Sequence, residues 1–165
     1  MEKWVSRLNE GVGKAVSWLS LVLVLLVFGN VWVRYVLNEP RAWSKELEWH
    51  VFSLLFLLAA GYSLQRDKHV RVDLFYERMG RKDQGAVNFW GTLLLLIPWC
   101  VVLVVTGWQA AVSAWEMGER SAEAGGLPNL WLIQFALPAG MLLLLLQGVV
   151  LLIRSYRQMR ENSAD

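Results

Sequence analysis

Four long apolar stretches, separated by short polar segments, constrain this sequence more than any other feature. Each has the roughly 17–25 residues that a helix needs to cross a bilayer. The composition agrees, because 56% of the residues are hydrophobic and 18% are charged, against about 45–50% and about 25% in soluble domains. The sequence therefore predicts an all-α integral membrane protein with a single domain, residues 1–165. Its four transmembrane helices are expected at about residues 15–36, 47–64, 86–107 and 130–153.

The first apolar stretch is predicted to be retained as a membrane span. It is longer than the core of a signal peptide, about 7–15 residues, and no small-residue cleavage site follows it. In the preceding residues 1–14, Trp4, Leu8 and Val12 recur at helical spacing among basic side chains. This pattern favours a short amphipathic helix on the membrane surface. A second short amphipathic helix is predicted at Leu74–Arg81.

The distribution of basic residues predicts on which side of the membrane the ends of the chain lie. The N-terminal segment, a central polar hinge (residues 65–85) and the C-terminal tail together hold twelve lysines and arginines. The other side holds only four, which are Arg34, Arg41, Lys45 and Arg120. Since cytoplasmic loops are enriched in Lys and Arg, both termini and the hinge are predicted to be cytoplasmic.

Prolines mark the expected interruptions of these helices. Pro98 and Pro138 each lack the N–H that would bond the carbonyl four residues earlier, so both positions predict a kink. Ser44 is expected to cap the second helix at its N-terminus, and Pro128 fits the first turn of the fourth.

No constellation of residues that could act together in catalysis is found in the predicted spans, so an enzyme is not expected. The span interiors hold no Asp, Glu, Lys or His, although proton and ion paths usually need such groups at depth. Gln134 and Gln147 are interpreted as hydrogen-bonding groups between helices. Cys100 is interpreted as a small apolar filler.

Neither haem nor a metal ion is expected as a cofactor. His50 and His69 flank opposite ends of one span, about 28 Å apart along a helix, so they cannot both ligate one haem. Metal binding by His69 and Asp73 is disfavoured because Arg71 lies between them and repels a cation. On the residues alone, these charges mark the lipid–water boundary.

Without a polar interior, the chain is expected to work by packing against a partner. Small residues that permit close helix contacts are Ala59, Ala60, Gly61, Ser63, Ala136, Ala139 and Gly140. Trp99, near mid-depth in the third span, either faces lipid or fills a groove on the partner. From their positions alone, Trp43 is interpreted as an interfacial anchor and Glu46 as an acid favoured by the helix dipole.

Four motifs give the chain a family resemblance. They are Trp43–Leu47 (WSKEL), Gly61–Asp73 ending in HVRVD, Ser121–Pro128 (SAEAGGLP), and Leu137–Gly140 (LPAG) followed by Gln147 and Gly148. On these motifs the chain resembles the small membrane subunit, of the DctQ type, of tripartite ATP-independent periplasmic (TRAP) transporters. The resemblance covers about residues 43–148. One departure is Lys45, where the family commonly has a second acid beside the one matched by Glu46.

The resemblance implies a small permease subunit in the bacterial inner membrane, with no substrate-binding residue of its own. It would scaffold a large, multi-span, elevator-type subunit for sodium-coupled uptake of an organic acid or related small solute. A periplasmic binding protein would deliver the solute, and residues 37–46 and 108–129 would form periplasmic loops; no nucleic acid is expected. The candidate partner-contact or motif residues are Trp43, Glu46, His69, Arg71, Asp73, Trp99, Ser121, Glu123, Gly126 and Pro128.

Two other functions are compatible with four spans. A membrane anchor of a redox or signalling complex would bind haem or quinone, or hold a soluble domain. A free-standing small transporter is disfavoured because no polar path crosses the predicted spans.

Overall fold

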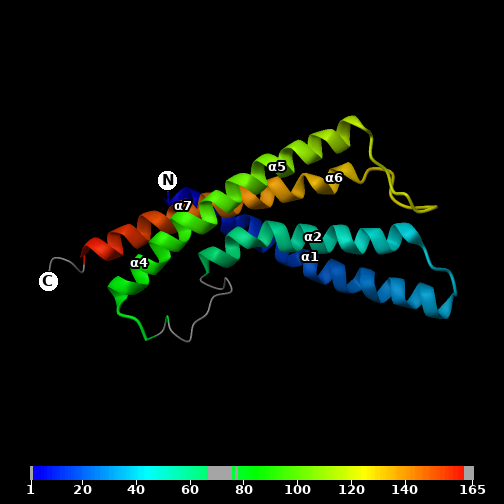
Figure 1. Cartoon of the computed structure of the whole chain (residues 1–165). Helices are drawn as coiled ribbons and strands as arrows, with labels where there is room; N and C mark the ends of the chain where they lie inside the picture. Colours follow the sequence, from blue (N-terminus) through cyan, green and yellow to red (C-terminus); the bar gives the residue numbers. More distant parts are fainter. Residues whose placement is uncertain (1, 67–75, 77, 162–165) are drawn as a thin grey trace.

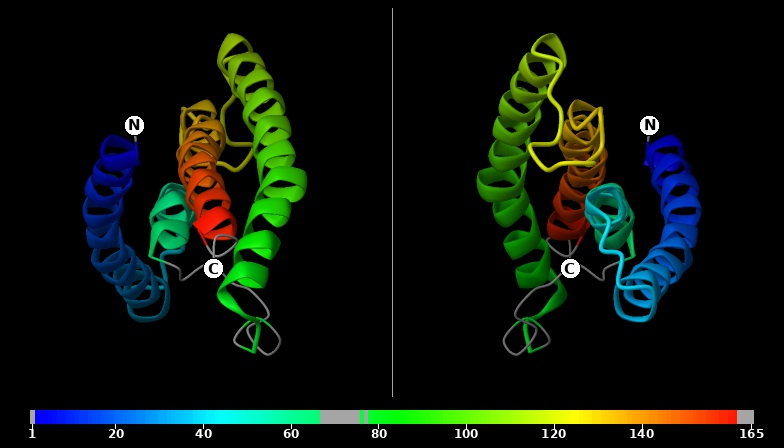
Figure 2. Two further views of the ribbon diagram at one scale, coloured as in Figure 1. Left: turned by 90° about the vertical axis from the view of Figure 1, so that its left-hand side faces the viewer. Right: turned by 90° about the vertical axis from the view of Figure 1, so that its right-hand side faces the viewer.

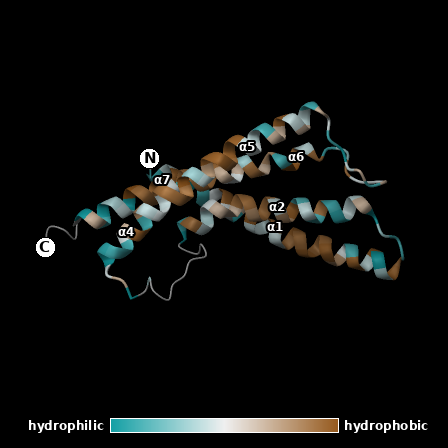
Figure 3. Ribbon diagram, viewed as in Figure 1, coloured by the Kyte–Doolittle hydropathy of each residue, from teal (hydrophilic) through white to brown (hydrophobic). Residues whose placement is uncertain are grey.

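The computed structural model describes residues 2–66, 76 and 78–161, and every element assigned there is helical. Four helical runs are long and apolar enough to cross a membrane. They are Glu2–Val36, Ala42–Gln65, Arg81–Glu116 and Trp131–Arg160. The predicted all-α class is thereby confirmed, with four helices that are long and apolar enough to be membrane spans. Figure 3 shows that hydrophobic residues dominate the middle of these helices, while hydrophilic residues gather toward their ends.

The long helices lie side by side in an order that differs from their order in the chain. Their elements are α1 (Glu2–Val36), α2 (Ala42–Gln65), α4 (Arg81–Gly91), π-helical η1 (Thr92–Leu96), α5 (Ile97–Glu116), α6 (Trp131–Gln134) and α7 (Ala136–Glu161). Across the bundle the order is α1, α2, α7 and then α4–α5 (Figure 2), and α7 contacts all the other long helices. The α1–α2 turn and the α5–α6 connection lie at one end of the molecule (Figure 1).

The N-terminal residues do not form a separate surface helix as predicted, because α1 runs without a break from Glu2 to Val36. The reason lies in tertiary packing. Val5, Asn9, Gly13 and Val16 are buried, and their spacing of three and four places them on one face. A Cβ added at Gly13 would overlap the ring of Tyr62 on α2, so the first turns of α1 pack closely against that helix.

The second predicted surface helix, Leu74–Arg81, is wrong at its described C-terminal end. Residues 74, 75 and 77 lie outside the described part, whereas Arg78 and Met79 form a turn and Gly80 is extended backbone at the N-cap of α4. Arg81 itself opens α4, which continues through η1 into α5. This helix therefore begins several residues before the apolar stretch expected at 86–107.

Both prolines within the spans accompany interruptions of regular α-helix, as predicted. Before Pro98, the N–H of Ile97 bonds the carbonyl of Thr92, five residues back, in the π-helical turn η1. Pro138 cannot bond the Gln134 carbonyl, and α6 ends at Gln134 while α7 starts at Ala136. The chain thus breaks one turn ahead of this proline.

Two predicted helix starts are wrong. The residue before α2 is Arg41 in an extended conformation, without a side-chain cap, so Ser44 lies inside the first turn. The extended backbone that follows Pro40 lets the helix begin earlier than the apolar pattern indicates. Pro128 is also outside the helix, because α6 begins only at Trp131 and the preceding backbone is held in the loop described below.

The small residues of α2 and α7 are used inside the chain. A Cβ added at Gly140 would lie 2.5 Å from the carbonyl oxygen of Leu57, and one added at Gly61 would lie 3.0 Å from that of Leu143. Glycine at these positions therefore lets the two backbones approach closely. Cys100 is 1% exposed, as expected of an apolar filler.

One polar pair lies in the interior of the bundle. The amide nitrogen of Asn9 on α1 donates to Oε1 of Gln147 on α7 over 3.4 Å, and the two residues are 1% and 2% exposed. The interpretation of Gln147 as a hydrogen-bonding group between helices is confirmed.

Candidate functional site

The α5–α6 loop (residues 117–130) reverses the chain through a network of backbone hydrogen bonds. The N–H of Ser121 donates to the carbonyl of Leu127 over 3.2 Å, and the N–H of Leu130 donates to that of Glu119 over 3.2 Å. Gly125 has a φ of 78°, a left-handed conformation that disfavours residues with a Cβ. The loop is therefore an ordered structure with its own internal contacts.

Glu46, on the first turns of α2, joins this loop to the helix bundle. Its Oε2 accepts the backbone N–H of Leu127 over 2.6 Å, and its Oε1 accepts the hydroxyl of Ser121. The Ser121 oxygen in turn accepts the backbone N–H of Glu123 over 3.1 Å. We call the contacts of Glu46 with Ser121 and Leu127 the Glu46 bridge.

Gly126 leaves the space that the Glu46 bridge needs. A Cβ added there would lie 2.9 Å from Oε1 of Glu46 and would overlap the Ser121 hydroxyl. The N–H of Gly126 also donates to the carbonyl of Glu123 over 3.0 Å. Any side chain at this position would push the carboxylate and the hydroxyl apart.

The bridge also affects the pKa of Glu46. This residue lies just before the apolar stretch expected at 47–64. The Leu127 N–H and, after it, the Ser121 hydroxyl stabilise the carboxylate, and they lower the pKa of Glu46 below its ordinary value of 4.5. Hydrogen bonds to a charged group are stronger than those between neutral groups. Glu46 is therefore an ionised acceptor at neutral pH.

Two further contacts hold the same end of the molecule together. The amide of Gln134 on α6 donates to Oε2 of Glu119 over 2.6 Å, and this bond anchors the start of the loop. Gln134 thus joins α6 to the α5–α6 loop. The amide of Asn30 on α1 donates to Oε1 of Glu48 on α2 over 2.8 Å. With the Glu46 bridge, these contacts connect α1, α2, the α5–α6 loop and α6.

The structure brings together residues from two of the sequence motifs. Glu46 of the first motif meets Ser121 and Gly126 of the third, and the backbone of Glu123 joins the same network. The side chains of Trp43, Glu123 and Pro128 are exposed around it. Sequence reasoning missed the backbone N–H of Leu127, because a main-chain donor carries no residue-type signal.

Trp99, another candidate residue, is not part of this network. It lies on α5, is 65% exposed, and lines a shallow apolar groove with Leu94, Pro98 and Val102. His69, Arg71 and Asp73 lie outside the described residues. Within the described ranges, no group of three or more His, Cys, Asp or Glu side chains is arranged to hold a metal ion.

The helices and their contacts define a small multi-pass membrane protein whose polar side chains connect its own helices and loops. The family of tripartite ATP-independent periplasmic transporters, DctQ component, matches residues 5–158. The chain belongs to this family of TRAP small permease subunits, and it is a non-enzymatic component of a transporter. This membership excludes the alternative of a redox or signalling anchor.

A curated relative supports the assignment. The chain is similar to the sialic acid TRAP transporter small permease protein SiaQ of Vibrio cholerae serotype O1. The two are 22% identical over 144 residues, which cover 85% of this chain and 76% of the relative. The resemblance seen in the four sequence motifs is thereby confirmed.

Proposed function

We propose that this chain scaffolds the large, multi-span subunit of a TRAP transporter in the bacterial inner membrane. The observation that carries the proposal is that polar side chains make contacts within the chain, whereas large apolar side chains are left exposed on its outside. The polar contacts described above join its own helices and loops, while large apolar side chains are exposed along its long helices. Those of α1 include Trp18, Leu25 and Phe28, each more than 60% exposed, and those of α5 and η1 include Leu95 and Trp99.

An elevator-type subunit needs a fixed frame against which its substrate-carrying part moves. Additional membrane helices that are connected to one another would enlarge that frame and resist tilting. The Glu46 bridge and the Asn30–Glu48 hydrogen bond support this role, because they tie successive helices together at one end. We infer that the transported solute is an organic acid or related small molecule and that uptake is coupled to sodium.

The topology follows from the positive-inside rule. Both termini and the hinge lie in the cytoplasm, so the Glu46 bridge and the α5–α6 loop face the periplasm. An ordered loop at that position offers a defined surface to the periplasmic substrate-binding protein. The exposed carboxylates of Glu116 and Glu123 are the groups of this surface that we expect to contact it.

Reconstitution tests the scaffold. The large subunit, with its binding protein and a sodium gradient, is placed in lipid vesicles with and without this chain, after copurification from mild detergent. Uptake is expected only when both membrane subunits are present. Full uptake by the large subunit alone, or solute transport by this chain alone, would contradict the proposal.

Charge reversal tests the loop surface. Glu116→Lys and Glu123→Lys together are expected to weaken the binding protein's affinity for the membrane complex. Glu119 is left unchanged, because its carboxylate bonds Gln134 and reversal would also disturb the loop. Asp83→Lys, on an exposed residue of α4, is the matched control on the opposite side. Equal affinities for the double variant and the control would remove the loop from the proposed interface.

A further inference from the structure

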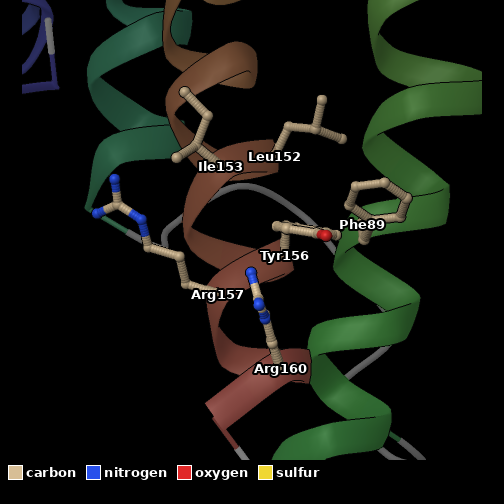
Figure 4. Close-up of a pocket in the computed structure, with 6 residues that line it drawn as sticks. All are labelled: Phe89, Leu152, Ile153, Tyr156, Arg157 and Arg160. Atoms are coloured by element: carbon tan, nitrogen blue, oxygen red, sulfur yellow. The ribbon is translucent and has the colours of Figure 1, made fainter.

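A groove lies between α4 and α7, on a part of the molecule that the proposed function does not use. Figure 4 shows its lining, in which Phe89 comes from α4 and the other side chains come from α7. The residues that line it are Phe89, Leu152, Ile153, Tyr156, Arg157 and Arg160. The groove is close to the C-terminus of α7, whereas the Glu46 bridge is at the opposite end of the bundle (Figure 1).

The lining changes in chemical character along α7. It begins with the aliphatic Leu152 and Ile153, continues with Tyr156, and ends with Arg157 and Arg160. At about 1.5 Å per helical residue, the change from aliphatic to cationic takes place over about 10 Å. A helix leaving the hydrocarbon core through the headgroup region meets an environment that changes in the same order.

Aromatic rings occupy the middle of the groove. The ring of Tyr156 lies 6.0 Å from that of Phe89 on α4, and Phe89 makes an edge-on contact with Trp90 over 5.3 Å. Trp90 is 55% exposed. Tyrosine and tryptophan are enriched where a membrane protein crosses the headgroup level, so this position matches the glycerol and ester region of a lipid.

The cationic end of the groove, on α7, is held in place by contacts with α1 and α4. Arg157 pairs with Glu2 over 3.1 Å, and Gln158 donates to the backbone carbonyl of Arg81 over 2.8 Å, which fixes the start of α4 beside α7. In the described ranges no ion pair is found for Arg160, whose guanidinium extends beside Tyr156 in Figure 4. A guanidinium binds phosphate through two parallel hydrogen bonds.

We propose that this groove binds an anionic phospholipid of the leaflet that faces the chain termini. The acyl chain lies against Leu152 and Ile153, the glycerol region lies against the Tyr156 and Phe89 rings, and Arg160 binds the phosphate. Arg157 adds positive field although Glu2 partly neutralises it. The order of apolar, aromatic and cationic groups, together with this charge complementarity, matches the acyl chain, glycerol region and phosphate of an anionic lipid.

Lipid titration by native mass spectrometry tests the site. The full-length chain is purified in detergent, freed of lipid, and titrated with phosphatidylglycerol and with neutral phosphatidylcholine. Phosphatidylglycerol is expected to bind more tightly. Arg160→Gln is expected to weaken phosphatidylglycerol binding about fivefold, the usual effect of one basic residue at a membrane surface. It should weaken phosphatidylcholine binding less, because the choline ammonium already neutralises the phosphate of that lipid. Arg160→Lys, which keeps the charge, is expected to retain most of the affinity.

Arg120→Gln is the matched control, because Arg120 is an exposed arginine in the α5–α6 loop. Circular dichroism of each variant checks that helix content is unchanged. Equal affinity for the two lipids, or equal losses for Arg160→Gln and Arg120→Gln, would overturn the proposal. Competition by glycerol phosphate at the same concentration as the lipid would also overturn it, because the acyl chain would then contribute nothing.

Discussion

Oε2 of Glu46 lies 2.6 Å from the backbone nitrogen of Leu127, although 81 positions separate the two residues in the chain. This contact joins the second helix to the loop between the third and fourth. The Glu46 carboxylate also accepts the Ser121 hydroxyl, so a single side chain orders a loop that belongs to another part of the sequence.

Replacing Glu46 with Gln is expected to loosen the α5–α6 loop. The substitution keeps the size of the side chain but removes its charge and one of its two acceptors, so hydrogen exchange at Leu127 should be severalfold faster. Glu39→Gln is the control, because that carboxylate pairs with Arg41 at the surface of the same end. If both variants exchange at the wild-type rate, the bridge does not order the loop.

The pH dependence of the loop follows from the lowered pKa of Glu46. A carboxyl group whose pKa is lowered in the folded state contributes stability that is complete above its ordinary value, 4.5, and that is lost as the pH falls through the folded pKa. The amide resonance of Leu127 should therefore stay constant from about pH 8 to about pH 5 and shift only in more acidic solution. The shift should be absent in Glu46→Gln, and a midpoint above 4.5 would contradict the assigned cause.

Gly140→Ala is expected to destabilise the bundle, because the new Cβ would lie 2.5 Å from the Leu57 carbonyl oxygen. Overpacking of this kind costs about 1–3 kcal/mol, and thermal unfolding in detergent measures it. Gly29→Ala is the matched control, since an added Cβ there has no neighbour within 4 Å. Unfolding temperatures that fall equally in the two variants would show that the α2–α7 contact is not the cause.

The buried pair of Asn9 and Gln147 should stabilise the bundle modestly. A double-mutant cycle of Asn9→Ala and Gln147→Ala is expected to give a coupling free energy of about 0.6 kcal/mol, as is usual for hydrogen bonds between membrane helices. The cycle is measured by unfolding in detergent. Asn9→Ala with Ser20→Ala, on an exposed residue of the same helix, should give no coupling. Additive losses in the first cycle would exclude a direct interaction.

The sequence indicated the helices well because a bilayer leaves a spanning chain few choices. Backbone groups in hydrocarbon must bond within the chain, so the apolar stretches alone predicted four helices. The helix ends were less predictable. Residues 2–14 looked like a surface helix, and only the burial of Asn9 and Gly13 against other helices explains why they continue α1.

The candidate site was predicted in pieces. The motif residues Glu46, Ser121 and Gly126 were singled out by resemblance, but nothing in their spacing predicted that they meet. From its position alone, Glu46 was interpreted as an acid at a helix start, an interpretation that misses its long-range hydrogen bonds. A contact between a side chain and a distant backbone N–H follows from the packing of whole helices, which local patterns do not encode.

The π-helical turn at Thr92–Leu96 lies between two places where the continuous rod of α4, η1 and α5 touches α7. Gly85 before the turn faces Met159, and Gly107 after it faces Leu137 and Pro138. Each residue of an α-helix advances the direction of its side chain by about 100°. A π-helical turn holds one more residue than an α-helical turn, so the turn at Thr92–Leu96 absorbs that residue while Gly85 and Gly107 keep their contacts with α7. An extra residue outside such a turn would rotate everything after it by about 100° and would take Gly107 away from Leu137 and Pro138.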